Sequence, residues 1–287
     1  MTCFGYNTNG LAHHRLSDAF TLLAELGYGG VALTPDVGEL DPLRPAPSLV
    51  KALRAQAEDL GLRLAIETGA RFVLDPRRKH RPSLLEAAAH ERERRVDFYR
   101  RSIDLAHGLG ASLVSIWSGC APDPTAADAP GVERDRVEPL WERFVTALVP
   151  VLDHARDRDV LIAFEPEPGM FIERPAGYLE LVRRLAHRGA ELGLTLDVGH
   201  LLVTGDLPVR SQIEALALRL MHVHLDDIKD GVHEHRMFGT GDLDLADTLS
   251  ALRAVDYKGM MAVELSRDSH RGADAAAEAM RHLRRAS

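Results

Sequence analysis

The chain of 287 residues has few cysteines, no long apolar run and no excess of basic residues. Only Cys3 and Cys120 occur, far apart and without C-x-x-C spacing, which argues against a structural disulfide or a cysteine-bound zinc ion. No apolar run reaches the roughly 18 residues that a bilayer-spanning helix needs. The first residues, MTCFGYNTNG, lack the basic and apolar regions of a secretion signal. We therefore expect a cytoplasmic protein without a membrane segment.

The charge balance limits the class of partner. The formal net charge is −8, and 45% apolar with 27% charged residues is usual for a soluble domain. An acidic chain lacks the basic face that nucleic-acid binding requires. Its one basic cluster, Arg77–Arg81, is either a solvated loop or a contact for an anionic or polyhydroxylated substrate.

Short apolar runs alternate with longer amphipathic segments along the whole chain. Eight runs predict strands: Cys3–Tyr6, Gly30–Leu33, Arg63–Ile66, Ser112–Trp117, Val160–Glu165, Leu194–Asp197, Met221–Leu225 and Met260–Leu265. The segments between them carry apolar residues three or four positions apart, the period of a helix packed on a sheet. They predict helices over Leu16–Leu26, Ser48–Leu60, Arg92–Leu109, Val137–Arg156, Ala176–His187, Ser211–Arg219 and Leu245–Ala254.

Glycines mark the predicted helix ends. Gly27, Gly61, Gly110 and Gly193 each precede a predicted strand, where a left-handed glycine closes the preceding helix. Strict alternation of strand and helix predicts parallel strands with helical crossovers. No G-x-G-x-x-G opens a helix after the first strand, which argues against an open dinucleotide-binding sheet. The sequence therefore predicts an α/β protein with one (β/α)8 TIM barrel domain over residues 1–287.

Polar residues end four consecutive predicted strands. These are Glu165, Asp197, His224 and Glu264. In such barrels, side chains at the carboxyl ends of strands face the reaction site. Their apolar flanks would bury each charge at considerable cost unless something compensates it. One shared divalent cation does so, and three carboxylates with one imidazole suit Mn²⁺, Mg²⁺, Co²⁺ or Zn²⁺.

These residues and their neighbours resemble the xylose-isomerase-like barrel superfamily. The motifs are Glu165, Asp197-Val198-Gly199-His200, His222-Val223-His224-Leu225, Glu264 and the string from His235 to Gly239-Thr240-Gly241. The superfamily includes sugar-phosphate isomerases and epimerases, ketose 3-epimerases, inosose isomerases and dehydratases, and endonuclease IV. The resemblance spans nearly the whole chain and specifies the superfamily better than the substrate.

The resemblance implies a role for individual residues. The implied metal ligands are Glu165, Asp197, His224 and Glu264, of which the two glutamates also form the acid–base pair. Implied substrate contacts are His200 and His235, with Glu67 and Trp117 shaping the pocket. His233 would complete the site from the loop.

For several residues the sequence leaves two interpretations of their role open. His222 shares a face with His224 but lies deeper, so it is either a core histidine or a substrate contact. Arg267, with His270, is either a phosphate contact at the barrel mouth or a solvated loop residue. Glu167 faces the pocket or caps the next loop. The segment Ala121–Gly131 is either a lid or a surface insertion.

The implied function is a divalent-metal-dependent isomerase or epimerase of a sugar, sugar phosphate or cyclitol. It would remove a proton next to a carbonyl, through an enediolate that the cation stabilises. A metal-dependent lyase or dehydratase on a keto sugar or inosose is an alternative, and so is a non-catalytic binding protein. An endonuclease IV-like phosphodiesterase fits less well, because no histidine ends the second to fourth strands. Exposed barrel helices also allow a homo-oligomer.

Overall fold

The computed structural model describes residues 3–35, 39–69, 71–121 and 134–287. Eight parallel strands close into a barrel in the order β1-β10-β7-β6-β5-β4-β3-β2. They are β1 (Cys3–Asn7), β2 (Gly30–Leu33), β3 (Arg63–Glu67), β4 (Leu113–Ile116), β5 (Leu161–Phe164), β6 (Gly193–Asp197), β7 (Leu220–Leu225) and β10 (Met260–Val263). The predicted (β/α)8 barrel is confirmed. The predicted lid segment, Ala121–Gly131, lies outside the described residues except for Ala121.

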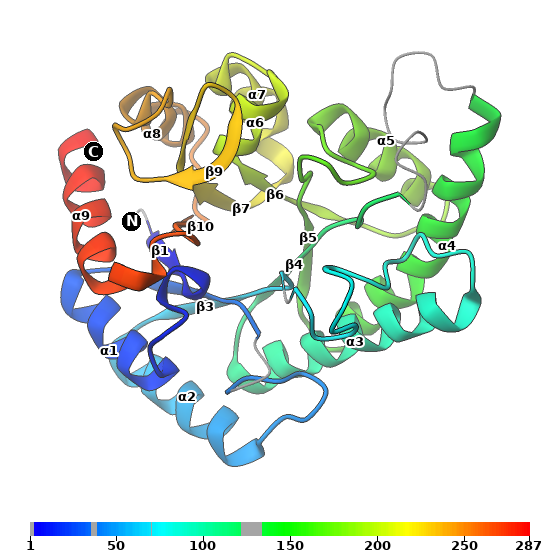
Figure 1. The fold of residues 1–287 in the computed structure, drawn as a ribbon, viewed down its shortest axis with the longest axis horizontal. Coiled ribbons are helices and arrows are strands. Elements are labelled where there is room, and N and C mark those ends of the chain that lie inside the picture. The colour runs from blue at the N-terminus through cyan, green and yellow to red at the C-terminus, as the bar shows by residue number, and fades with distance from the viewer. Residues whose placement is uncertain (1–2, 36–38, 70, 122–133) are drawn as a thin grey trace.

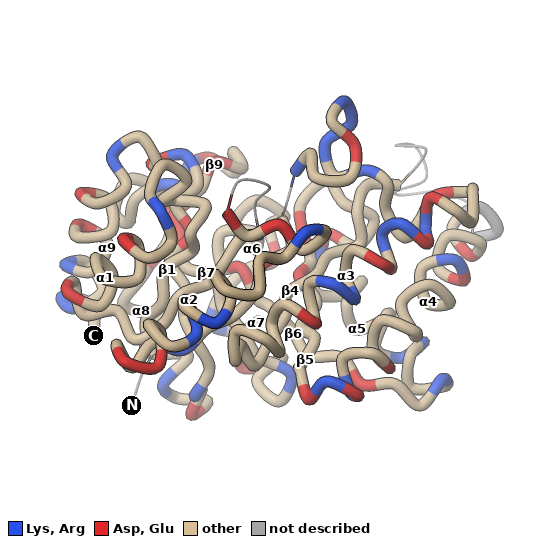
Figure 2. Tube along the Cα trace, turned by 90° about the horizontal axis from the view of Figure 1, so that it is seen from below, with Lys and Arg blue, Asp and Glu red and all other residues tan. Residues whose placement is uncertain are grey.

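Helices surround this barrel (Figure 1). They are α1 (Leu16–Leu26), α2 (Pro47–Leu60), α3 (Ala89–Leu109), α4 (Arg134–Asp157), α5 (Pro175–Ala186), α6 (Val198–Thr204), α7 (Val209–Leu216), α8 (Leu245–Ala254) and α9 (Gly272–Ala286). Short 3-10 turns are η1 (Thr8–Leu11), η3 (Ala217–Arg219) and η4 (Ser269–Arg271). None of the described helices combines the length and apolar character that crossing a lipid bilayer requires. Along the outer helices, basic and acidic positions are interspersed (Figure 2).

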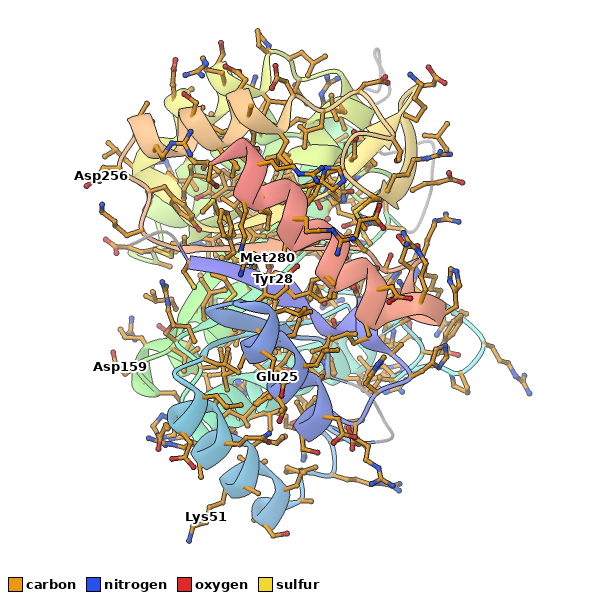
Figure 3. The ribbon with its side chains drawn as sticks, turned by 90° about the vertical axis from the view of Figure 1, so that its left-hand side faces the viewer. Glu25, Tyr28, Lys51, Asp159, Asp256 and Met280 are labelled. Atoms are coloured by element: carbon orange, nitrogen blue, oxygen red, sulfur yellow. The ribbon has the colours of Figure 1, made fainter. Side chains whose placement is uncertain are left out.

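The predicted elements differ from the observed ones in particular places. The predicted helix Ser211–Arg219 is two elements, α7 and η3, and the helices α6 and α9 are absent from the prediction. Helix α9 packs beside α1, where Tyr28 donates a 2.8 Å hydrogen bond to the Ala276 carbonyl. Tyr28 and Met280, which are labelled in Figure 3, are both buried.

Three predicted strands end earlier than expected. Strands β4, β5 and β10 stop before Trp117, Glu165 and Glu264. The backbone N–H groups of Glu165 and Glu264 still bond to the neighbouring strands, at 2.8 and 3.0 Å. Their side chains therefore start from the last rung of the barrel, where they can turn into its mouth.

Glycine closes three of the four helices as predicted. Gly27, Gly61 and Gly110 have φ values of 93°, 67° and 73° at the ends of α1, α2 and α3. The prediction for Gly193 is wrong, because this residue begins β6. A Cβ at Gly193 would lie 2.1 Å from Sδ of Met221, so the Met221 side chain would have to move to admit one.

Apolar residues, most of them small, fill the bottom of the barrel. The cluster comprises Cys3, Ala32, Ala65, Leu113, Ala163, Met260 and Ala262. Residues two positions further along β3, β5 and β10 are Glu67, Glu165 and Glu264, on the same inward face. The barrel interior is thus apolar at its base and acidic at its carboxyl end.

An antiparallel hairpin, β8 (Asp227–Lys229) and β9 (Val232–Arg236), follows β7. The sequence pattern predicts only a loop here. The carboxylate of Asp227 is fully buried and accepts N–H bonds from Ile228, Gly239, Gly241 and Leu243, at 2.8 to 2.9 Å. A Cβ at Gly241 would lie 2.3 Å from Oδ1 of Asp227, so the G-x-G loop wraps tightly around this carboxylate.

Candidate metal centre

Four neighbouring strands carry the predicted metal ligands. Glu165 follows β5, Asp197 ends β6, His224 lies in β7 and Glu264 follows β10. Asp197 and His224 are cross-strand partners. These four strands are adjacent in the barrel, so their carboxyl ends form one continuous arc.

The four side chains meet at one point. Nδ1 of His224 lies 3.0 Å from Oε1 of Glu165, 3.1 Å from Oε2 of Glu264 and 3.7 Å from Oδ2 of Asp197. One ligand atom from each residue lies within 4.8 Å of those of the other three. Asp197, His224 and Glu165 are buried, and Glu264 is partly exposed.

This donor set fits a divalent cation. Three carboxylates face one imidazole nitrogen, and a single N–H can donate a proton to only one of them at a time. Oδ2 of Asp197 is buried and has no hydrogen-bond partner among the described residues. Buried carboxylates this close repel one another unless a positive charge lies between them.

The second nitrogen of His224 has its own carboxylate. Nε2 lies 3.1 Å from Oε1 of Glu67, and Nε2 of His222 lies 2.9 Å from the same oxygen. Burial raises the pKa of Glu67, but the two histidines outweigh it and lower the pKa to about 2. An N–H at Nε2, facing this carboxylate, leaves the Nδ1 lone pair of His224 free to ligate a cation.

Asn9 orients Glu264 and is absent from the sequence prediction. Nδ2 of Asn9 donates a 2.7 Å hydrogen bond to Oε1 of Glu264. The backbone N–H of Asn9 bonds to Oδ1 of Asn7, which also accepts a bond from the Thr34 hydroxyl. The signal in the sequence is the polar end of the first strand, Tyr6-Asn7-Thr8-Asn9.

A histidine cluster lies beside the predicted ligands. Nδ1 of His200 lies 3.1 Å from the Pro166 carbonyl oxygen, and its Nε2 lies 3.1 Å from Nε2 of His233. Burial lowers the pKa of His200, but Asp197 and Glu167 outweigh it and raise the pKa to about 9.

The same cluster contains Asp226, which is not among the residues that the sequence predicts for the site. Oδ2 of Asp226 lies 2.8 Å from Nδ1 of His235, and its carboxylate is fully buried. Burial and the charge of Asp197 raise the pKa of Asp226 to about 7. A Cβ at Gly199 would lie 2.3 Å from Oδ1 of Asp226, which explains the glycine in Asp197-Val198-Gly199-His200.

A cavity of about 1040 Å³ opens above these groups. The predicted site residues that line it are Glu67, Trp117, Glu165, His224, His235, Glu264 and Arg267. Asp197, His200 and His222 are buried and are not among its lining residues, so substrate contact by the two histidines stays a prediction. Glu167 and His233 also line the cavity, and burial raises the pKa of Glu167 to about 7.

Comparisons with known proteins agree on the fold. A family model described as xylose isomerase-like TIM barrel matches residues 20–286. An L-ribulose 3-epimerase structure has 20% sequence identity and a TM-score of 0.76, covering 100% of this chain and 96% of that chain. D-Allulose 3-epimerase from Methylomonas sp., in complex with D-allulose, has 17% identity and a TM-score of 0.76, covering 100% and 97%.

The structure of a 3-keto-D-glucoside 4-epimerase from E. coli is similar as well. It has 16% identity and a TM-score of 0.75, covering 99% of this chain and 100% of that chain. No curated protein matches the sequence.

Proposed function

Because the chain belongs to the xylose isomerase-like TIM barrel family, we propose that it is a divalent-cation-dependent isomerase or epimerase of a ketose or related polyhydroxylated ketone. The observation that carries the proposal is the meeting of Glu165, Asp197 and Glu264 at Nδ1 of His224, beneath an open cavity. The sugar epimerases named among the similar structures support the substrate class.

Glu165, Asp197, His224 and Glu264 would hold the cation, which when bound polarises a carbonyl and its neighbouring hydroxyl. Glu165 and Glu264 come from β5 and β10, the two outer strands of the four-strand arc. Their carboxylates therefore approach a substrate from two sides. One removes the proton from the carbon next to the carbonyl, and the other delivers a proton to the opposite face.

The neighbouring side chains keep these groups in place. Asn9 holds Oε1 of Glu264, which leaves Oε2 beside His224. Glu67 fixes the ring of His224 from the far side. Trp117 and Met170 line the same cavity and are nearly inaccessible to solvent. They keep water away from the reacting carbons.

The test is solvent exchange at the carbon next to the carbonyl. The protein is loaded with Mn²⁺, Mg²⁺, Co²⁺ or Zn²⁺ and incubated in D₂O with a panel of ketoses and inososes, and mass spectrometry follows the products. An epimerase or isomerase gains deuterium at that carbon without loss of water. Glu165→Gln and Glu264→Gln should lower the rate by about 100- to 10,000-fold.

Glu180→Gln is the matched control, because Glu180 lies on α5 and pairs with Arg183 and Arg184 at the surface. Normal exchange in both Glu165→Gln and Glu264→Gln on a turned-over substrate refutes the acid–base assignment. A product that has lost water identifies a dehydratase instead. Elemental analysis of the purified protein should find about one divalent cation per chain.

A further inference from the structure

Four basic side chains line one arc of the cavity mouth. We call Arg15, Arg71, Lys79 and Arg267 the cationic rim. Arg15 follows β1, Arg71 and Lys79 follow β3, and Arg267 follows β10. Strands β10, β1, β2 and β3 are consecutive in the barrel, so the rim occupies a single side of the mouth. All four residues are exposed.

The cationic rim is largely free of ion pairs. Within the described part of the chain, Arg15, Arg71 and Lys79 have no carboxylate within 4.0 Å, and Arg267 only approaches Glu234, at 3.8 Å. The basic cluster Arg77–Arg81 differs from the cationic rim, because two of its members, Arg78 and Arg81, form ion pairs with carboxylates.

Nε of Arg78 lies 2.6 Å from Oδ2 of Asp75, and Nη1 of Arg81 lies 2.6 Å from Oε1 of Glu86. Lys79 has no such partner and lines the cavity. In a chain with more acidic than basic residues, unpaired cations at a cavity mouth are available to a ligand.

The charges of the cavity are separated by depth. Glu67 and Glu165 lie at its floor, only 5% and 6% exposed. The exposed Glu39 also lines the cavity near Arg15, and its Oε2 accepts a hydrogen bond from the Leu16 backbone N–H. A ligand with its reacting carbons at the floor thus meets carboxylates first and cations further out.

The cavity has room for such a ligand. Its volume of about 1040 Å³ lies at the upper end of the usual range for small-molecule sites. Phe72 adjoins Arg71, lines the cavity and is 51% exposed, which offers an apolar face to the carbon backbone of a sugar.

We propose that the cationic rim binds an acidic group, a carboxylate or a phosphate, at the end of the substrate remote from the reacting carbons. Guanidinium groups bind both anions with paired N–H donors, which suits Arg15 and Arg71. The inference rests on the proposed function for the orientation of the substrate. It adds the substrate class: acidic keto sugars rather than neutral ones.

The test compares ligands that differ only at the remote end. Calorimetry of the cation-loaded protein measures the affinity for D-fructose, D-fructose 6-phosphate and D-fructuronate, with inorganic phosphate as the simplest acidic probe. We expect the acidic sugars to bind about tenfold or more tightly than fructose at low salt, and less so at high salt. Arg15→Gln, Arg71→Gln and Lys79→Gln should each weaken acidic binding about three- to tenfold.

Arg77→Gln is the matched control, because Arg77 is exposed in the same loop but does not line the cavity. This variant should bind all ligands like the unmodified protein. A preference for only the phosphate or only the carboxylate supports the inference and identifies the acid.

The inference is overturned if the acidic sugars bind no better than fructose, if no acidic probe binds, or if the preference survives in every rim variant. The proposed function fails separately. If binding depends on the rim but no sugar exchanges deuterium, the role of the cationic rim is supported and the proposed isomerase activity is refuted.

Discussion

The two ring nitrogens of His224 face different partners. Nδ1 faces the three carboxylates of the candidate metal centre, and Nε2 faces Glu67. Since a neutral imidazole carries one N–H, the position of the proton on Nε2 decides whether Nδ1 can act as a ligand. Glu67 therefore acts through His224, as a positioning residue.

Replacing Glu67 with Gln should weaken cation binding by about 10- to 100-fold while the barrel stays folded. An amide holds the N–H of His224 less firmly and supplies no negative charge. Competition with a fluorescent chelator measures the affinity. Glu86→Gln is the control, since Glu86 is a buried carboxylate that pairs with Arg81 instead. Equal affinity in the two variants contradicts the role of Glu67.

A second residue-scale prediction concerns His80. Its ring lies edge-on to Trp117, with centroids 4.8 Å apart. Burial lowers its pKa to about 3, with help from Lys79, Arg95 and Arg71. Below the ordinary histidine pKa of about 6.5, the imidazole of His80 is protonated in the unfolded chain but not in the folded one. The free energy of unfolding therefore falls as the pH drops from about 6.5 toward 3.

His80→Asn should remove this part of the pH dependence. Asparagine tolerates the left-handed backbone at φ 63°, so the substitution adds little strain. Urea unfolding at pH 7, 6 and 5, in the presence of a chelator, should show the variant gaining stability relative to the unmodified protein as the pH falls. The exposed His13→Asn is the control and should show no such gain; a gain of the same size there rules out burial of His80 as the cause.

Individual residues show where sequence reasoning succeeds. Glu165 and Glu264 follow apolar runs, so a strand prediction alone brings them to the barrel mouth. The sequence does not predict the roles of Asn9 and Asp226. Asn9 bonds to Glu264 and Asp226 pairs with His235, and in both cases the partner comes from another segment. Such pairs depend on which strands are neighbours and on the exact register, and local sequence contains neither.

At the scale of elements, the hairpin β8–β9 brings His233 and His235 to the cavity. Its strands are short and mostly polar, so no alternation of apolar and polar residues predicts them. Besides the buried Ile228, the Asp227 carboxylate and its four backbone N–H donors hold this region together. The G-x-G motif can be recognised in the sequence, but its bonding to the Asp227 carboxylate cannot.

Asp227→Asn should lower the free energy of unfolding by about 1.5 to 3 kcal/mol, because one side-chain oxygen becomes an N–H donor facing other donors. Hydrogen exchange in Val232–Arg236 should become faster. Asp230→Asn is the control, since Asp230 lies in the turn of the same hairpin at φ 54°, which asparagine tolerates. Similar losses in both variants would mean that the Asp227 bonds do not hold the hairpin.

For the whole molecule, the alternation of strand and helix was enough to predict a closed barrel. The strand order and the parallel direction follow from general rules for such chains. Helix α9 was missed, although its apolar residues recur at helical spacing. The prediction for Gly193 is wrong because a glycine that begins a strand and packs against Met221 looks, in sequence, like a glycine that ends a helix.

A cation held by residues from four strands should stabilise the barrel as a whole. At a concentration about 100 times the Kd, binding adds about 2.7 kcal/mol and should raise Tm by several degrees. Calorimetry with and without the cation checks this. His224→Asn should lose most of the shift, and an equal shift in that variant would place the cation elsewhere.

The arc formed by β5, β6, β7 and β10 has a consequence for how the two halves of this barrel divide their roles. All four proposed ligands lie after the turn at residues 158–160, whereas Arg15, Arg71 and Lys79 lie before it. A recombination at this turn would exchange three members of the cationic rim and keep the four proposed ligands on one half, but the incoming half would have to supply Glu67 and Asn9, which position His224 and Glu264. Half-barrel chimaeras joined there, with Glu67 and Asn9 retained, would test whether ligand selectivity and cation binding can be exchanged independently.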